Sequence, residues 1–137
     1  MREIKNKLHG SCLCGEVKFE IEGDLESFYL CHCGWCQKDT GSAHAANLFL
    51  INSSLNWIIG EEKVINYHHP KTEHYKSFCS ICGSALPNIQ MNGELVVAPA
   101  GSVREVPIEP TAHIFTSKRA NWDNALEKVK MYEELPE

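Results

Sequence analysis

The sequence has no long hydrophobic run and no concentration of basic residues. Its longest apolar stretches, near 48–51 and 95–100, are far shorter than the roughly 18 residues that a membrane-spanning helix requires. The segment from Met1 to Leu8 lacks the apolar run of about seven residues that forms a signal-peptide core. Lysine and arginine number 13 against 18 acidic residues, a net charge of −5, and no window gathers the basic ones. We therefore expect a soluble, cytoplasmic protein that binds neither nucleic acid nor membranes.

The sequence also lacks repeats, low-complexity tracts and a recognisable linker. Its 137 residues fall within the range of roughly 100 to 200 residues over which one core usually closes. Hydrophobic residues make up 43% and charged residues 23%, values typical of globular chains rather than disordered or coiled-coil ones. These values predict one domain that spans residues 1–137.

Patterning with a period of two predicts a chain that is mostly sheet. Residues 16–22 alternate polar and apolar side chains, as a strand with one buried face does. Gly23 and Asp24 predict a turn after this strand. Further segments with strand patterning, separated by glycine, asparagine and proline, are 28–30, 45–51, 63–68, 74–78, 95–98 and 113–116.

Helical periodicity is strongest near the C-terminus. Within residues 121–134, Trp122, Leu126 and Val129 recur at a spacing of three to four residues. Asp123 falls in the first turn, where an acidic side chain favours the helix dipole. We therefore predict a short C-terminal helix with Trp122 in the core, and a shorter helical turn after Cys36.

Cysteine is the residue type in excess. The chain contains seven cysteines, an odd number, and disulfides are disfavoured in a chain without an export signal. Metal binding or catalysis is therefore the leading explanation. The cysteines form three groups: Cys12-Leu13-Cys14, Cys31-His32-Cys33-Gly34-Trp35-Cys36, and Cys79-Ser80-Ile81-Cys82.

The spacing of these groups suggests how the cysteines divide between two zinc ions. Thiolates one or two residues apart can turn toward one ion; a structural zinc takes four protein ligands, whereas a catalytic zinc keeps three and an open position. In the favoured partition a closed structural site is formed by Cys12, Cys14, Cys79 and Cys82. A second zinc with a free coordination position is then held by Cys31, Cys33 and Cys36.

Two alternatives to this partition remain open. A single four-cysteine zinc could accompany three ordinary buried cysteines. A histidine could instead close the triplet into a second structural site, and the candidates for that fourth ligand are His32 and His44.

The cysteine groups and their surroundings resemble the glutathione-dependent formaldehyde-activating enzyme family. The matching stretches are residues 10–19 (GSCLCGEVKF), 31–38 (CHCGWCQK) with 41–43 (GSA), and 78–84 (FCSICGS). Later landmarks are Ala100-Gly101-Ser102 and His113-Ile114-Phe115, which leads to Trp122. The resemblance covers roughly residues 8–125. It is specific, because three cysteine motifs in this order are improbable by chance.

The resemblance implies a twisted, mainly antiparallel β fold, related to that of methionine sulfoxide reductase B and similar zinc proteins. It also implies two zinc ions per chain with the partition given above, so that the three-cysteine zinc is catalytic. The implied activity is that of a zinc-dependent carbon-sulfur lyase or synthase, which joins formaldehyde to glutathione. The expected partners are therefore a small thiol and an aldehyde.

The family reaction requires a proton carrier and a binding surface. A thiol in the fourth position of the three-cysteine zinc would lose its proton and attack an aldehyde held beside it. His44 and His113 are the candidate proton carriers, although each is first interpreted as a structural histidine. Cations that could meet substrate carboxylates are Arg104, Lys38, Lys118 and Arg119.

Other aromatic side chains receive no firm role. Trp35, inside the triplet, is expected either to line a pocket or to pack on the metal loop. His68, His69 and His74 are interpreted as surface histidines at strand ends and are assigned no metal.

Two other classes of function compete with the enzyme. A zinc-stabilised binding module with the same fold would have a closed triplet and no accessible metal. A thiol redox enzyme would use Cys33 or Cys36 without metal as a nucleophile.

Overall fold

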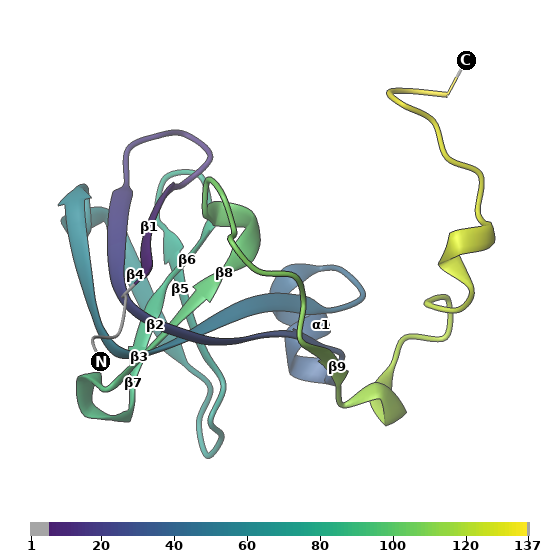
Figure 1. Cartoon of the computed structure of the whole chain (residues 1–137), viewed down its shortest axis with the longest axis horizontal. Coiled ribbons are helices and arrows are strands. Elements are labelled where there is room, and N and C mark those ends of the chain that lie inside the picture. The colour runs from purple at the N-terminus through teal and green to yellow at the C-terminus, as the bar shows by residue number, and fades with distance from the viewer. Residues whose placement is uncertain (1–5, 137) are drawn as a thin grey trace, which may run out of the picture.

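The protein is built from two β-sheets, seen here in a computed structural model that describes residues 6–136 (Figure 1). The larger sheet has the strand order β1-β2-β3-β8-β7, and β9 pairs with the end of β2 that lies away from β1. The smaller sheet has the order β4-β5-β6. The strands are β1 (Asn6–Ser11), β2 (Lys18–Cys31), β3 (Ala45–Ile59), β4 (Val64–His68), β5 (Tyr75–Cys79), β6 (Ala85–Leu86), β7 (Asn88–Gln90), β8 (Leu95–Pro99) and β9 (Ala112–Ile114).

The predicted fold class is confirmed: the chain is mainly β, and its strands are mainly antiparallel. Only the pairing of β9 with β2 is parallel among the pairings of the described strands. Alternation places Phe19 and Ile21 of β2 in the core, with 1% and 0% of their surfaces exposed. They pack with Leu48 and Leu50 of the neighbouring strand β3. The strand patterning of the sequence thus located the sheet that builds the core.

The turn predicted at Gly23 is wrong, because β2 continues through it to Cys31. The pairing of β2 with β3 shifts register between Glu22 and Asp24, as at a β-bulge. A Cβ at Gly23 would lie 2.5 Å from the Cβ of Ser53 on the partner strand. Gly23 therefore permits close approach of two long strands, rather than a reversal of the chain.

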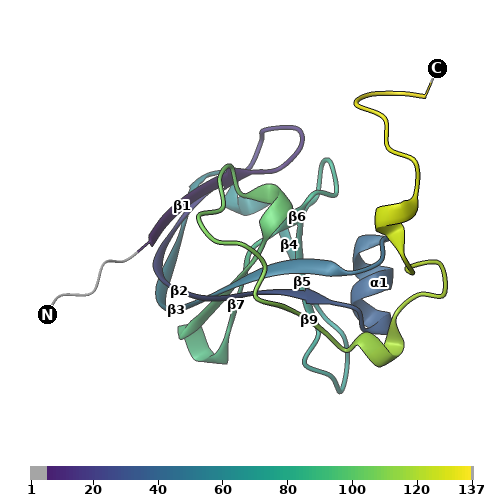
Figure 2. The same ribbon diagram turned by 45° about the vertical axis from the view of Figure 1, so that its right-hand side comes forward.

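The long strands β2 and β3 carry the chain to one end of the molecule, where α1 (Gly34–Thr40) connects them (Figure 2). Gly41 ends this helix in the left-handed region at φ 65°, and its N–H donates to the Gln37 carbonyl oxygen. This helix fulfils the expectation of a helical turn near Cys36. The helix begins at Gly34, soon after β2 ends at Cys31. The end of β2 and the start of α1 therefore fix the positions of the three cysteines.

The predicted C-terminal helix is wrong. Residues 121–134 contain only a short 3₁₀ helix, Leu126–Lys128, and the chain extends away from the sheets (Figure 1). Trp122 is 56% exposed and is not a core residue. The other 3₁₀ helices are Glu61–Lys63, Met91–Gly93, Ala100–Ser102 and Thr116–Lys118. Among residues 6–136, no helix is both long enough and apolar enough to cross a membrane.

Candidate metal centres and active-site cavity

The first cysteine cluster joins the two sheets. Cys12 and Cys14 lie in the turn between β1 and β2, whereas Cys79 ends β5 of the smaller sheet and Cys82 follows it. The four sulfur atoms lie within 4.8 Å of one another. Backbone N–H groups point at these sulfurs: Val17 donates to Cys12 Sγ at 3.3 Å. The arrangement gathers four thiols from two distant segments, as the sequence predicts.

The protein backbone and the neighbouring sulfurs shift the pKa values of these thiols in opposite directions. An N–H of Cys14 lowers the pKa of Cys82 to about 6. Cys14 accepts from the N–H of Glu16, yet desolvation and the neighbouring sulfurs raise its pKa to about 12. The backbone therefore favours the thiolate of Cys82, and binding a cation would displace the protons of the other thiols.

The second cluster is the triplet at the start of α1. Cys31 ends β2, the sulfur of Cys33 caps the helix by accepting from the N–H of Cys36 at 3.3 Å, and Cys36 lies in the first turn. The three sulfurs lie within 4.8 Å of one another. Within residues 6–136, no histidine or carboxylate joins this group at that distance. The triplet thus offers three ligands and leaves one side open.

Burial and the helix start act in opposite senses on the triplet. Burial raises the pKa of Cys36 and that of Cys31. Burial also opposes ionisation of Cys33, but the backbone N–H of Cys36 lowers the pKa of that thiol below its usual value. Cys33 is therefore the member of the triplet that ionises first.

The donor sets of both clusters fit a soft or borderline divalent metal such as zinc. Sulfur-only sites select such ions, and zinc takes thiolates in tetrahedral geometry. Four sulfurs complete a tetrahedron, and three leave one vertex for another ligand. The structure thus contains two clusters that could hold a metal ion.

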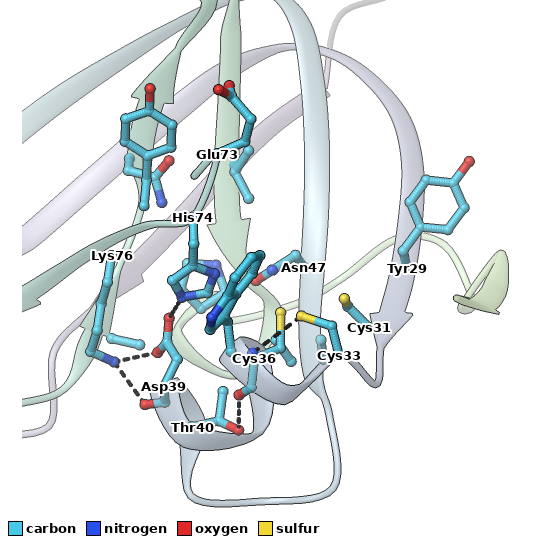
Figure 3. A pocket seen from close by; sticks show the side chains of 18 of the residues that line it. Tyr29, Cys31, Cys33, Cys36, Asp39, Thr40, Asn47, Glu73, His74 and Lys76 are labelled. Atoms are coloured by element: carbon cyan, nitrogen blue, oxygen red, sulfur yellow. Dashed lines mark hydrogen bonds and ion pairs between the residues drawn. The ribbon is translucent and has the colours of Figure 1, made fainter. Parts of the chain in front are cut away.

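The open side of the triplet faces a cavity of about 360 Å³. Figure 3 shows the sulfurs of Cys31, Cys33 and Cys36 along its wall. Apolar side chains, including Phe49, Leu86 and Val97, form much of the remaining lining. Polar groups reach it from several strands, among them Tyr29, Asn47, Asn88 and Gln90. A mostly apolar cavity with a few polar groups is typical of a site for a small molecule.

A hydrogen-bonded group of three charged or titratable side chains forms another part of the same wall (Figure 3). His74 Nε2 lies 2.7 Å from Asp39 Oδ2. Lys76 Nζ donates to Asp39 Oδ1 at 2.5 Å and to the Asp39 carbonyl oxygen at 3.0 Å. The three side chains are 14% to 25% exposed. His74 stands at a strand end, as predicted, but the surface position is wrong: the side chain is 17% exposed and forms part of the cavity wall.

The histidines singled out from the sequence lie elsewhere. His32 is 2% exposed, with Nε2 2.8 Å from His113 Nδ1 and Nδ1 3.1 Å from Asp123 Oδ2. Burial lowers the pKa of His32. The ring of His44 packs 5.1 Å from that of His32. None of these three histidines lines the cavity.

The predicted cations also lie outside the cavity wall. Arg104 lines a separate surface hollow beside β1. The cavity lining does not include Lys38, Lys118 or Arg119. Trp35 does line the cavity, although half of its surface is exposed. A signal for the missed group does exist in the sequence: Asp39 follows Cys36 by three residues, and His74 and Lys76 share one face of a strand pattern.

Comparison with known proteins gives matches over most of the chain. Residues 7–118 match a family model described as glutathione-dependent formaldehyde-activating enzyme. A curated protein of Halomonas elongata, named "Putative glutathione-dependent formaldehyde-activating enzyme", is 27% identical over 126 residues, which cover 84% of this chain and 78% of that protein. A crystal structure of a Rhodobacter sphaeroides protein has a TM-score of 0.57 and 22% identity, covering 77% of this chain and 98% of that one. The latter likeness supports the fold.

Proposed function

The chain belongs to the glutathione-dependent formaldehyde-activating enzyme family, and from this membership and the geometry of the triplet we propose that it is a zinc-dependent carbon-sulfur lyase. It joins a small thiol, of the glutathione type, to an aldehyde, of the formaldehyde type. The observation that carries the proposal is the position of the triplet. Its three sulfurs line the cavity, and no fourth protein ligand joins them among the described residues.

The two clusters have different roles in this proposal. Cys12, Cys14, Cys79 and Cys82 hold a structural zinc, because their four sulfurs complete its coordination. The catalytic zinc is held by Cys31, Cys33 and Cys36. Zinc at the triplet supplies a position at which a thiol is acidified.

The chain's own residues provide the enclosure for the two substrates. Phe49, Leu86 and Val97 exclude water from their part of the cavity wall. Asn47 and Asn88 offer amide groups, which match the peptide bonds of a glutathione-like thiol. The proposal places the reaction in the cytoplasm, where cysteines stay reduced and available as metal ligands.

The test is the glutathione-dependent rate of formaldehyde exchange, followed by NMR on protein that metal analysis shows to carry two zinc ions. The proposal predicts acceleration above the uncatalysed background. Cys33→Ser should abolish it, and Ser80→Ala, beside a ligand of the other cluster, should not.

An unchanged background rate with both zinc ions bound would contradict the proposed activity. In that case the same fold would serve as a zinc-stabilised binding module. Acceleration that persists in Cys33→Ser would contradict the assignment of the triplet.

A further inference from the structure

The group formed by Asp39, His74 and Lys76 is tied to the triplet through a single element. Cys36 and Asp39 are three residues apart in α1, so both project from one face of this helix. His74 and Lys76 come from β5 and the residue before it, across the cavity. In Figure 3, the His74 side chain descends toward the helix face that bears Asp39 and Cys36. The helix α1 therefore fixes the position of the Cys36 sulfur relative to Asp39, the hydrogen-bond partner of His74.

The hydrogen bonds determine which nitrogen of His74 is available. A carboxylate only accepts, so the contact at 2.7 Å requires that Nε2 carries the proton and donates it to Asp39. In the neutral ring Nδ1 then has a free lone pair, and no hydrogen bond from it is found among residues 6–136. Lys76 holds Asp39 in place through two further hydrogen bonds. The result is an oriented imidazole base on the cavity wall.

His74 lines the same cavity as the three sulfurs of the triplet. A sphere with the volume of the cavity, about 360 Å³, is about 9 Å across, which is the scale of an ordinary small-molecule site. A thiol at the triplet and an aldehyde beside it occupy that space. A base on the wall of such a cavity can contact a bound substrate directly or through one water molecule.

We propose that His74 is the proton-transfer residue of this cavity and that Asp39 and Lys76 position its ring. This inference rests on the proposed function. His74 Nδ1 accepts the proton of the substrate thiol, and the sulfur lone pair forms a bond to the aldehyde carbon as the carbonyl π bond breaks. The proton then passes from Nδ1 to the new alkoxide oxygen. The product is the S-hydroxymethyl adduct, so atoms, charge and electrons balance without an oxidant or a reductant.

The other histidines near the triplet are less suited to this task. His32 is 2% exposed, its Nε2 is hydrogen-bonded to His113 Nδ1 at 2.8 Å, and it does not line the cavity. Neither His44 nor His113 lines the cavity. The assignment of the proton carrier therefore moves from the histidines expected from the sequence to His74.

The experiment compares His74→Gln with His9→Gln, which replaces an exposed histidine of β1 far from the cavity lining. Zinc content and melting temperature are measured for both variants first. His74→Gln should lower the rate of adduct formation about 100-fold or more, the usual scale of a lost general acid-base. His9→Gln should keep the wild-type rate.

A second measurement counts protons without any turnover. Glutathione alone is titrated calorimetrically into the zinc-replete protein at neutral pH, in buffers with different ionisation enthalpies. The wild-type protein should release almost no proton to the buffer, because His74 takes it, and His74→Gln should release about one. Asp39→Asn, which tests positioning, should give an intermediate value.

The outcomes separate this inference from the proposed function. Wild-type acceleration with equal rates and proton counts in His74→Gln would overturn the role of His74 and leave the lyase intact. Absence of acceleration, with a proton count that still depends on His74, would support His74 as the acceptor and reject formaldehyde as the aldehyde. Failure of glutathione to bind would overturn both.

Discussion

Gly60 shows how a single backbone position supports the structure around the four-cysteine cluster. It follows β3 with φ 85°, and an added Cβ would lie 2.1 Å from the carbonyl oxygen of Glu16 and 2.9 Å from Cα of Val17. Both contacts are with backbone and cannot be relieved by rotating a side chain. We expect Gly60→Ala to cost about 2 to 4 kcal/mol of unfolding free energy, from the left-handed conformation and the clash together.

Urea unfolding followed by circular dichroism measures this loss. Gly101→Ala is the matched control, because an added Cβ there meets nothing within 4 Å and φ is not in the left-handed region. It should change the unfolding free energy by less than about 0.5 kcal/mol. Equal values for the two variants would show that the chain can move away from Gly60.

Individual site residues differ in how far the sequence reveals them. The cysteines could be predicted because ligands for one ion recur at short spacing, which leaves a local pattern. The pairing of His74 with Asp39 leaves no such local pattern, because the two residues are 35 positions apart and only the folded chain brings them together. Asp123 and His32 are likewise distant in sequence and close in the fold. Local patterns therefore reveal the cysteine clusters better than they reveal the contacts of the histidines.

Among elements, the two cysteine clusters should differ in their effect on stability. The four-cysteine cluster connects the turn before β2 with the end of β5, and so links the two sheets. The triplet connects only β2 with the adjoining helix α1. We expect Cys82→Ser to lower the melting temperature by more than about 10 °C, since structural zinc contributes folding free energy directly. Cys33→Ser should lower it by only a few degrees.

Thermal melts of the two variants, with zinc content measured on the same samples, test this ranking. Chelation of zinc from the wild-type protein provides an independent comparison and should reproduce the loss seen in Cys82→Ser. A larger loss in Cys33→Ser than in Cys82→Ser would contradict the assignment of the structural site.

The elements themselves were predictable where one face is buried. The alternation in residues 16–22 and the apolar stretch near 48–51 correspond to β2 and β3, because burial of alternate side chains imposes that pattern. The turn at Gly23 failed, since a glycine also suits a bulge between closely spaced strands. The helix over residues 121–134 failed because its apolar side chains find no surface to bury against: Leu126 and Val129 are 45% and 58% exposed.

At the scale of the whole molecule, the C-terminal segment is attached to the sheets at a few points and then leaves them. The Lys118 carbonyl oxygen accepts from Gln37 Nε2 at 2.9 Å, and Asp123 lies against the buried ring of His32. Beyond these contacts the chain extends outward in both views (Figures 1 and 2). Met131 and Leu135 are 83% and 82% exposed. The contribution of the segment to stability should therefore end near residue 124.

Two truncations test this division of the chain. Removing residues 125–137 deletes only the outward part, so the melting temperature should change by less than about 2 °C. Removing residues 116–137 also deletes the Lys118 carbonyl that accepts from Gln37 and the Asp123 carboxylate 3.1 Å from the buried His32 Nδ1, at a cost of about 1 to 3 kcal/mol. That variant should melt several degrees lower. An equal loss of melting temperature in the two truncations would contradict this division. It would show that residues 125–137 pack in solution against another molecule.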